Sequence, residues 1–149
     1  MSAQAEIEVS VRLLVAILLG AVIGFEREFT RHPAGLRTMS AVCLGSCLFT
    51  VAGTLPLHTD PTRVAAQVTT GIGFIGAGAV LRSGRSVQGL TTAATIWVVA
   101  AVGVAAGLGY LILATATAVL LLLSLVGLKV VEDRFLSGIM MEERRTEHS

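Results

Sequence analysis

Residues 108–128 read LGYLILATATAVLLLLSLVGL and contain no charged side chain. An α-helix rises about 1.5 Å per residue, so roughly 20 apolar residues cross the ~30 Å hydrocarbon core of a bilayer. The quoted stretch has the length and the apolar character that such a crossing requires. It predicts a transmembrane helix, and it makes lipid the expected solvent for the neighbouring segments as well.

The composition of the whole chain points the same way. Its 149 residues are 54% hydrophobic and 14% charged, with a mean hydropathy of +0.80. Soluble domains are about 25% charged, so this balance favours a membrane protein. The length fits one compact domain. No basic face with interleaved aromatic residues is present, so nucleic acid is not an expected partner.

Four more apolar runs precede the quoted one, and together the five cover residues 7–25, 38–57, 64–81, 90–107 and 108–128. None alternates apolar and polar residues as a barrel strand would, which leaves helices as the spanning solution. We expect an all-α integral membrane protein with about five transmembrane helices in residues 1–128 and a short charged tail in 129–149. The connection at 107–109 is very short, so four spans with a re-entrant segment are an alternative.

The basic residues indicate the orientation. If the first connection, the third connection and the tail are cytoplasmic, only Arg12 and Arg63 of the 11 lysines and arginines lie outside. The inner side then carries Arg27, Arg31, Arg37, Arg82, Arg85, Lys129, Arg134, Arg144 and Arg145. The positive-inside rule therefore predicts an outer N-terminus and a cytoplasmic C-terminus.

Charged residues gather where the first two runs meet. Glu26 and Glu28 end the first helix, and Arg37 opens the second at the same membrane boundary. An ion pair between them is the simpler interpretation. Since Mg²⁺ prefers oxygen ligands, a carboxylate such as Glu26 is also a candidate metal ligand. Glu8 and Arg12 are four residues apart and can pair on the first helix.

The third run begins with a helix-start signal. Asp60 followed by Pro61 predicts an N-cap and a proline at the first helical position. Cation binding by Asp60 at the outer mouth is the alternative. Arg63 and Gln67 lie four residues apart, so one face of the helix carries both of them. Each polar group inside a span needs a partner or water, which makes these residues candidate functional positions.

The third run contains four glycines that allow two interpretations: Gly71, Gly73, Gly76 and Gly78. The letters of residues 71–76 match a dinucleotide fingerprint, but that motif needs a βαβ unit and not a membrane span. The glycines therefore predict close contact between helices, because small residues let backbones approach in lipid. Alternatively, they mark an unwound helix whose free backbone groups line an ion or substrate path.

The fourth run opens with Thr91, Thr92 and Thr95, which predict caps or bonds to the backbone, with a functional role as the alternative. Cys43 and Cys47 are four residues apart on one helix face and predict packing, not a disulfide. No serine or carboxylate belongs to a recognisable catalytic set, so we do not expect an enzyme.

Several blocks of residues resemble the N-terminal membrane domain of the MgtC/SapB family of bacterial proteins. They occur in family order and cover most of residues 20–109: Gly24-Phe-Glu-Arg-Glu28, Ala34-Gly-Leu-Arg-Thr38, Asp60-Pro-Thr-Arg-Val-Ala-Ala-Gln67, Gly71-Ile-Gly-Phe-Ile-Gly-Ala-Gly78 and Gly89-Leu-Thr-Thr-Ala-Ala-Thr-Ile-Trp97. The resemblance implies that Glu26, Arg37, Asp60, Arg63 and Gln67 matter for function.

The same resemblance implies a multi-pass protein of the bacterial inner membrane, associated with growth at low magnesium. It further implies action by binding and restraining other membrane proteins, the ATP synthase among them. Direct transport of Mg²⁺, with a dimer enclosing the path, is the alternative function. Virulence-type members have Asn where Thr91 stands and carry an additional cytoplasmic domain, so a virulence role is not carried over.

Overall fold

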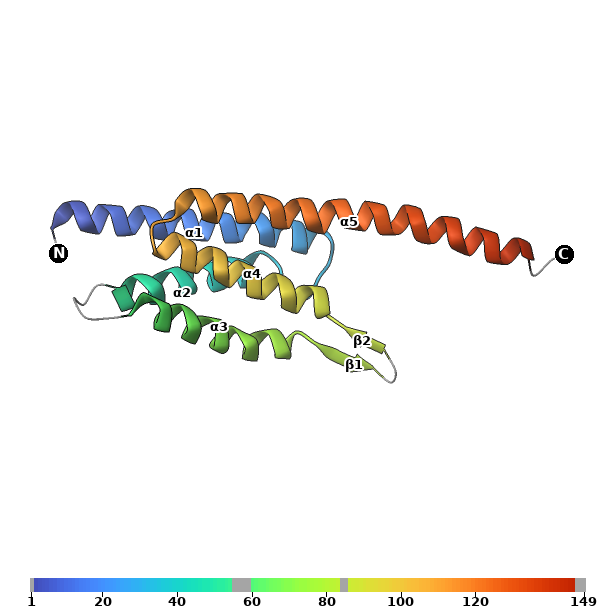
Figure 1. Ribbon diagram of the computed structural model, residues 1–149, viewed down its shortest axis with the longest axis horizontal. Helices are drawn as coiled ribbons and strands as arrows, with labels where there is room; N and C mark the ends of the chain where they lie inside the picture. The colour runs from blue at the N-terminus through green and yellow to red at the C-terminus, as the bar shows by residue number, and fades with distance from the viewer. Residues whose placement is uncertain (1, 55–59, 84–85, 147–149) are drawn as a thin grey trace.

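The structure, a computed structural model, describes residues 2–54, 60–83 and 86–146. Five helices and one short hairpin follow each other along the chain (Figure 1). Their bounds are α1 Ala3–Phe29, α2 Leu36–Thr54, α3 Pro61–Gly78, β1 Leu81–Ser83, β2 Ser86–Gln88, α4 Leu90–Gly107 and α5 Leu111–Thr146. The all-α prediction is confirmed, with the small hairpin as an addition to it.

Successive helices run in opposite directions (Figure 1). The α1–α2 connection, the β1–β2 hairpin and the C-terminal part of α5 lie toward one end of the molecule, which we call the hairpin end. The N-terminus and the α4–α5 turn lie toward the other, which we call the N-terminal end. The segments predicted to share the cytoplasmic side therefore share one end of the fold. Which end faces the cytoplasm stays a prediction.

The helix α2 is the centre of the packed region. Gly20 and Gly24 of α1 lie against one side of it, so close that an added Cβ on Gly20 would be 2.8 Å from Cys43 Cβ. Gly107 of α4 lies against another side, where an added Cβ would be 2.7 Å from the Cys47 carbonyl oxygen. Cys43 and Cys47 are buried and free, as their spacing predicts. Small residues thus hold three helices at short range.

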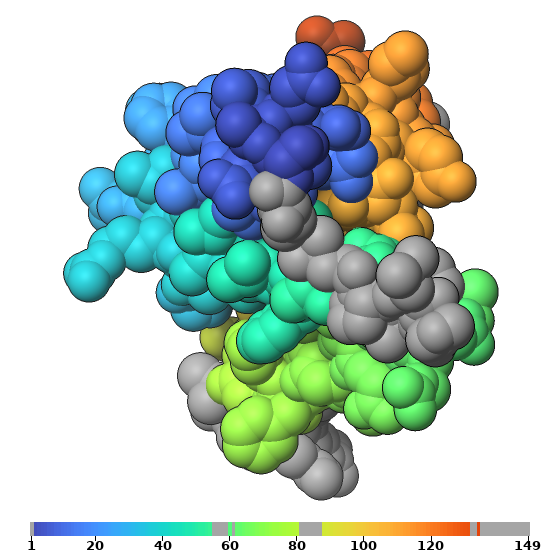
Figure 2. Space-filling view, turned by 90° about the vertical axis from the view of Figure 1, so that its left-hand side faces the viewer, coloured from blue at the N-terminus to red at the C-terminus, as the bar shows by residue number. Residues whose placement is uncertain are grey.

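The helix α3 lies at the edge of this region. It packs mainly on α4, where Gly76 faces Ala93, and less on α2. Figure 2 shows α3 on the side of the molecule away from α1 and α5. Four of the described helices are long and apolar enough to cross a membrane: Ala3–Phe29, Leu36–Thr54, Leu90–Gly107 and Leu111–Val131. The polar residues of α3 make it less apolar than these four, so its crossing stays a prediction.

The helix boundaries differ from the predicted runs, most clearly after α3 and at the two ends of α5. The helix α3 ends at Gly78 instead of 81, and β1 pairs with β2 in the connection that follows. The turn between α4 and α5 is a full break, with Gly109 at φ 87° and Tyr110 N–H bonded to the Ala105 carbonyl. The helix α5 continues to Thr146, well beyond the predicted end at 128.

Candidate functional site

A charged cluster closes the hairpin end of the packed helices. The Arg27 guanidinium is buried, with 2% of the residue exposed, and it binds the neighbouring Glu26 carboxylate through two bonds. Arg27 Nε donates to Glu26 Oε2 at 2.6 Å, and Nη2 donates to Oε1 at 2.9 Å. Thr30 Oγ1 is 2.7 Å from His32 Nδ1 beside this pair. Two-point binding of this kind fixes both side chains.

The ion pair predicted between Glu26 or Glu28 and Arg37 is wrong. Glu26 has its sequence neighbour Arg27 as its partner, and α1 continues past both residues to Phe29. The Glu28 carboxylate accepts the backbone N–H of Leu36 at 2.9 Å and so caps the start of α2. Arg37 is exposed and turns to a pocket in the connection.

That pocket, the arginine pocket, has a volume of about 410 Å³. It is lined by Glu28, Arg31, His32, Pro33, Gly35, Arg37 and Thr38. In the described part of the chain, neither Arg31 nor Arg37 forms an ion pair with a carboxylate. Burial and the positive charge of Arg27 lower the pKa of His32, so this imidazole is neutral at pH 7. The pocket therefore presents two free guanidinium groups and one carboxylate.

The threonines of α4 divide into two kinds. Thr95 Oγ1 donates to the Thr91 carbonyl at 2.8 Å, which confirms the expected bond to the backbone. Thr92 Oγ1 is buried, and no hydrogen-bond partner for it lies among the described residues. Since Gly103 lies against Cys43 in the parallel α2, Thr92, about three turns earlier, lies level with the α1–α2 connection.

Asp60 caps α3, as predicted. Its carboxylate accepts the Thr62 backbone N–H at 2.9 Å and the Thr62 hydroxyl at 2.6 Å. These bonds lower the pKa of Asp60, so the carboxyl stays ionised well into the acid range. Asp60 begins α3 at the N-terminal end, whereas Glu26 lies at the hairpin end (Figure 1). The two candidate metal ligands cannot form one site. The described residues hold no group of three His, Cys, Asp or Glu placed for a metal ion.

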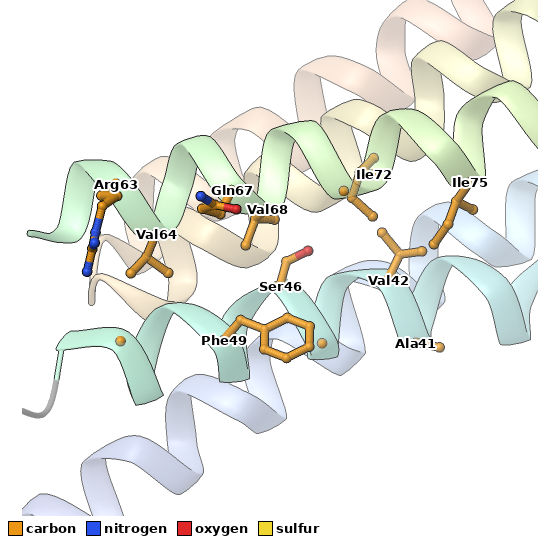
Figure 3. A pocket seen from close by; sticks show the side chains of 13 residues that line it. Ala41, Val42, Ser46, Phe49, Arg63, Val64, Gln67, Val68, Ile72 and Ile75 are labelled. Carbon is orange, nitrogen blue, oxygen red and sulfur yellow. The ribbon is translucent and has the colours of Figure 1, made fainter.

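A groove with a volume of about 780 Å³ lies between α2 and α3. Figure 3 shows Ser46 and Phe49 of α2 opposite Gln67, Val68 and Ile72 of α3. Arg63 lies at the mouth near the N-terminal end. The lining residues are Ala41, Val42, Gly45, Ser46, Phe49, Gly53, Arg63, Val64, Gln67, Val68, Gly71, Ile72 and Ile75. We call this cavity the α2–α3 groove.

The glycines of α3 behave differently from the glycines of α1 and α4. An added Cβ at Gly71, Gly73 or Gly78 would meet nothing within 4 Å in the described structure, and at Gly76 it would only touch Ala93 at 3.7 Å. The predicted close contact is therefore absent within the described chain, apart from Gly76. The alternative of an unwound helix is wrong, since α3 is helical from Pro61 to Gly78. Gly71 lines the α2–α3 groove instead.

The structure brings Arg63, Gln67 and Gly71 together with two residues that sequence reasoning missed, Ser46 and Phe49. It also identifies Arg27, which the sequence indicates only as an inner-side charge, as the buried partner of Glu26. A charged residue that directly follows a carboxylate at the end of an apolar run was the available signal for Arg27. Nothing in the sequence indicates that Ser46 faces a cavity.

Comparison with known proteins supports the family expected from the sequence blocks. The model of the MgtC family matches residues 13–134. Protein MgtC of Salmonella typhimurium is 46% identical over 110 residues, which are 74% of this chain and 48% of that protein. Protein MgtC of Brucella abortus is 53% identical over 95 residues, 63% of this chain and 40% of that protein.

An uncharacterized protein of Haemophilus influenzae is 40% identical over 125 residues, covering 76% of this chain and 52% of its own length. The chain thus spans about half the length of the curated relatives it matches. No solved structure matches it. Its helices long and apolar enough to span a membrane make it a multi-pass membrane protein. With most of its length matched by the family model, the chain belongs to the MgtC family.

Proposed function

We propose that this chain is a non-enzymatic protein of the bacterial inner membrane that acts in adaptation to low magnesium by binding a membrane-protein partner. The α2–α3 groove is the surface that receives a transmembrane helix of that partner. The role in adaptation to low magnesium is inferred from membership of the MgtC family. The groove carries the partner role, because it is a large lateral cavity whose lining is mostly apolar and comes from α3 and from α2, a helix long and apolar enough to cross a membrane.

The walls of the groove suit a helix. In lipid, helices associate through close packing, and small residues permit the closest approach. Gly45 and Gly71, one from each wall, have no neighbour within 4 Å of an added Cβ. Ala41 adds a third small residue. The two helices are in close contact toward the N-terminal end, where an added Cβ on Gly53 would collide with Val64. The groove therefore opens from that contact toward the hairpin end.

Polar groups along the groove indicate the chemistry of the partner. Arg63 and Gln67 line it from α3, and Ser46 lines it from α2. In the described residues Arg63 forms no ion pair. The charge of Arg63 interacts with the Asp60 carboxylate at the start of α3, but among the described residues no carboxylate lies within ion-pair distance of it. A cation in this position at the edge of a bilayer favours a partner helix with a carboxylate at that level, and Gln67 can bond to an amide or hydroxyl deeper in the groove. A helix with an acidic residue near its end is the occupant that fits.

Two glycines of α3 permit a matched test in a strain that depends on this protein for growth at low Mg²⁺. Gly71→Leu fills the groove, while Gly73→Leu adds the same side chain two residues away, outside the groove lining and also in open space. We expect Gly71→Leu to abolish growth at low Mg²⁺ and co-purification of the partner, and Gly73→Leu to preserve both. Equal behaviour of the two variants would contradict the partner site.

Direct transport is the competing function, and liposomes separate the two. Purified protein in vesicles that contain a magnesium-sensitive dye should give no flux above empty vesicles. A flux that Glu26→Gln and Asp60→Asn remove would replace partner control by Mg²⁺ transport. A groove filled by a second copy would show instead as a dimer in detergent that Gly71→Leu dissociates.

A further inference from the structure

The arginine pocket is separate from the α2–α3 groove and has a different character. Its walls come from the end of α1, the α1–α2 connection and the first turn of α2. The groove is mostly apolar, whereas this pocket is lined by three ionisable residues of the connection region, Arg31, His32 and Arg37, together with Glu28. Its ligand must therefore differ in chemistry from the apolar helix proposed for the α2–α3 groove.

Positive charge dominates the pocket. Arg31 and Arg37 are exposed to it and form no ion pair among the described residues. The only carboxylate in the lining belongs to Glu28, and one of its oxygens already accepts the Leu36 N–H. Two guanidinium groups on one small cavity, with a single partly engaged carboxylate, favour an anion with several acceptor oxygens.

The backbone adds donors of the same kind. Arg37 and Thr38 lie in the first turn of α2, whose N–H groups have no intrahelical partner. The first bond at this helix start runs from Met39 N–H to the Gly35 carbonyl. The Thr38 hydroxyl also lines the pocket. The connection holds this shape because Arg31 takes a left-handed conformation, φ 59°, and its N–H bonds to the Glu28 carbonyl.

The position of the pocket identifies the source of the anion. It lies where two membrane-type helices end, which is the depth of lipid phosphate groups. Two exposed apolar side chains lie next to lining residues in the sequence: Phe29, which follows Glu28, is 82% exposed, and Leu36, which precedes Arg37, is 38% exposed. An anion held in the pocket would thus have acyl chains beside these two residues. Basic pockets at this level of membrane helices bind anionic lipid headgroups.

We propose that the arginine pocket binds the phosphate group of an anionic phospholipid of the phosphatidylglycerol or cardiolipin type. The guanidinium groups of Arg31 and Arg37 donate hydrogen bonds to the phosphate oxygens from the two sides of the connection. Backbone N–H groups at the start of α2 donate to the same phosphate. The bound lipid would stabilise the α1–α2 connection next to the Glu26–Arg27 pair. This assignment does not depend on the partner role of the groove.

The test measures lipid binding by native mass spectrometry of the full chain released from detergent micelles. Phosphatidylglycerol is titrated against phosphatidylcholine of equal chain length. The variants are Arg31→Asn, since Asn tolerates the left-handed conformation, Arg37→Gln, and both together. Arg63→Gln removes the same charge at the far end of the molecule and serves as the control. A folded monomer by size exclusion is required of each variant.

We expect wild type and Arg63→Gln to prefer phosphatidylglycerol clearly. Each pocket substitution should weaken phosphatidylglycerol binding about five-fold, the fold-change that ~1 kcal/mol per basic residue near an anionic surface gives, while binding of phosphatidylcholine stays constant. Should the double variant not fold, the two single variants carry the same test. Equal binding of both lipids by wild type, or unchanged phosphatidylglycerol binding by the folded pocket variants, would overturn the proposal.

Inorganic phosphate distinguishes a headgroup from a free phosphate. If the lipid is the ligand, millimolar phosphate should leave phosphatidylglycerol bound, because Phe29 and Leu36 contact its chains. If phosphate displaces the lipid from wild type, and itself binds wild type but not the double variant, then a soluble phosphate is the better ligand and the lipid assignment is overturned.

Discussion

Glycines lie at the interfaces of α2 with α1 and α4 and at its interface with α3, but the helices pack closely only in the first case. On the α1 and α4 sides, glycines bring backbones so close that a single added methyl group would collide with the facing helix. On the α3 side, Gly45 and Gly71 lie across an open groove and meet nothing within 4 Å. Lipid tails are as apolar as leucine, so hydrophobicity alone closes neither interface. A glycine in a membrane helix therefore marks a potential contact, and the partner decides whether the contact forms.

The two interfaces also differ in how they treat charge. The packed side ends in the buried Glu26–Arg27 pair, in which the charges satisfy each other inside the chain. The groove side carries Arg63, which forms no ion pair among the described residues. The buried charges of the packed side are paired within the chain, whereas on the groove side we propose that a partner helix supplies the counter-charge. The following predictions test that difference, beginning with the largest effect.

Glu26→Gln should destabilise the packed side most. It leaves the Arg27 guanidinium buried without its counter-charge, which costs about 3–5 kcal/mol. SDS titration of the protein in detergent micelles, followed by circular dichroism, measures the change in free energy of unfolding. Glu6→Gln, which changes an exposed carboxylate at the other end of α1, is the control and should lie near wild type. If Arg27 depends on Glu26, adding Arg27→Met to Glu26→Gln should recover part of the loss.

Gly20→Ala should cost about 1–3 kcal/mol by overpacking. The new Cβ would lie 2.7 Å from the Met39 carbonyl oxygen and 3.0 Å from Ser40 Cα, and backbone atoms cannot move aside as a side chain can. The same SDS titration measures it. An unchanged midpoint would mean that α1 and α2 are not held by backbone contact.

Gly71→Ala is the counterpart on the groove side and should be neutral or stabilising by up to about 1 kcal/mol. No neighbour lies within 4 Å of the new Cβ, and alanine is the better helix former. The pair Gly20→Ala and Gly71→Ala thus compares one chemical change in two environments. A loss of stability in Gly71→Ala comparable to that in Gly20→Ala would show that the groove is closed in the membrane.

Acid should affect the hairpin end before the start of α3, with the smallest effect of the series. Burial and Arg27 lower the pKa of His32, so the unfolded chain takes up the proton first. The stability that neutral His32 contributes is complete above pH 6.5 and is lost as the pH falls through the lowered pKa. The pKa of Asp60 is also lowered, so its contribution is complete above about pH 3.8 and is lost only below that.

Unfolding midpoints between pH 7.5 and 5 would test this order. The midpoint should fall in wild type, and it should fall less in His32→Gln, whereas Asp60→Asn should keep the slope of wild type. A wild-type midpoint that does not change over this range would rule out the contribution of His32.

The local features of the fold could be predicted from the chain alone. Helix number and order follow from the length and apolarity of each run, since only a helix satisfies its own backbone in lipid. The Asp60 cap and the Glu8–Arg12 pair depend on neighbours within one helical turn, and both are confirmed. These interactions involve residues whose relative positions are fixed as soon as a helix forms.

Only the tertiary structure decided which faces meet. In the folded chain Glu26 pairs with Arg27 and not with Arg37. Gly20 and Gly107 pack against α2, whereas Gly71 lines a groove together with Ser46. Hydropathy cannot make these choices, because a residue that faces lipid and a residue that faces another helix are equally apolar. The rotation of each helix about its axis is set by packing with residues distant in sequence, and so it emerges only when all the helices are together.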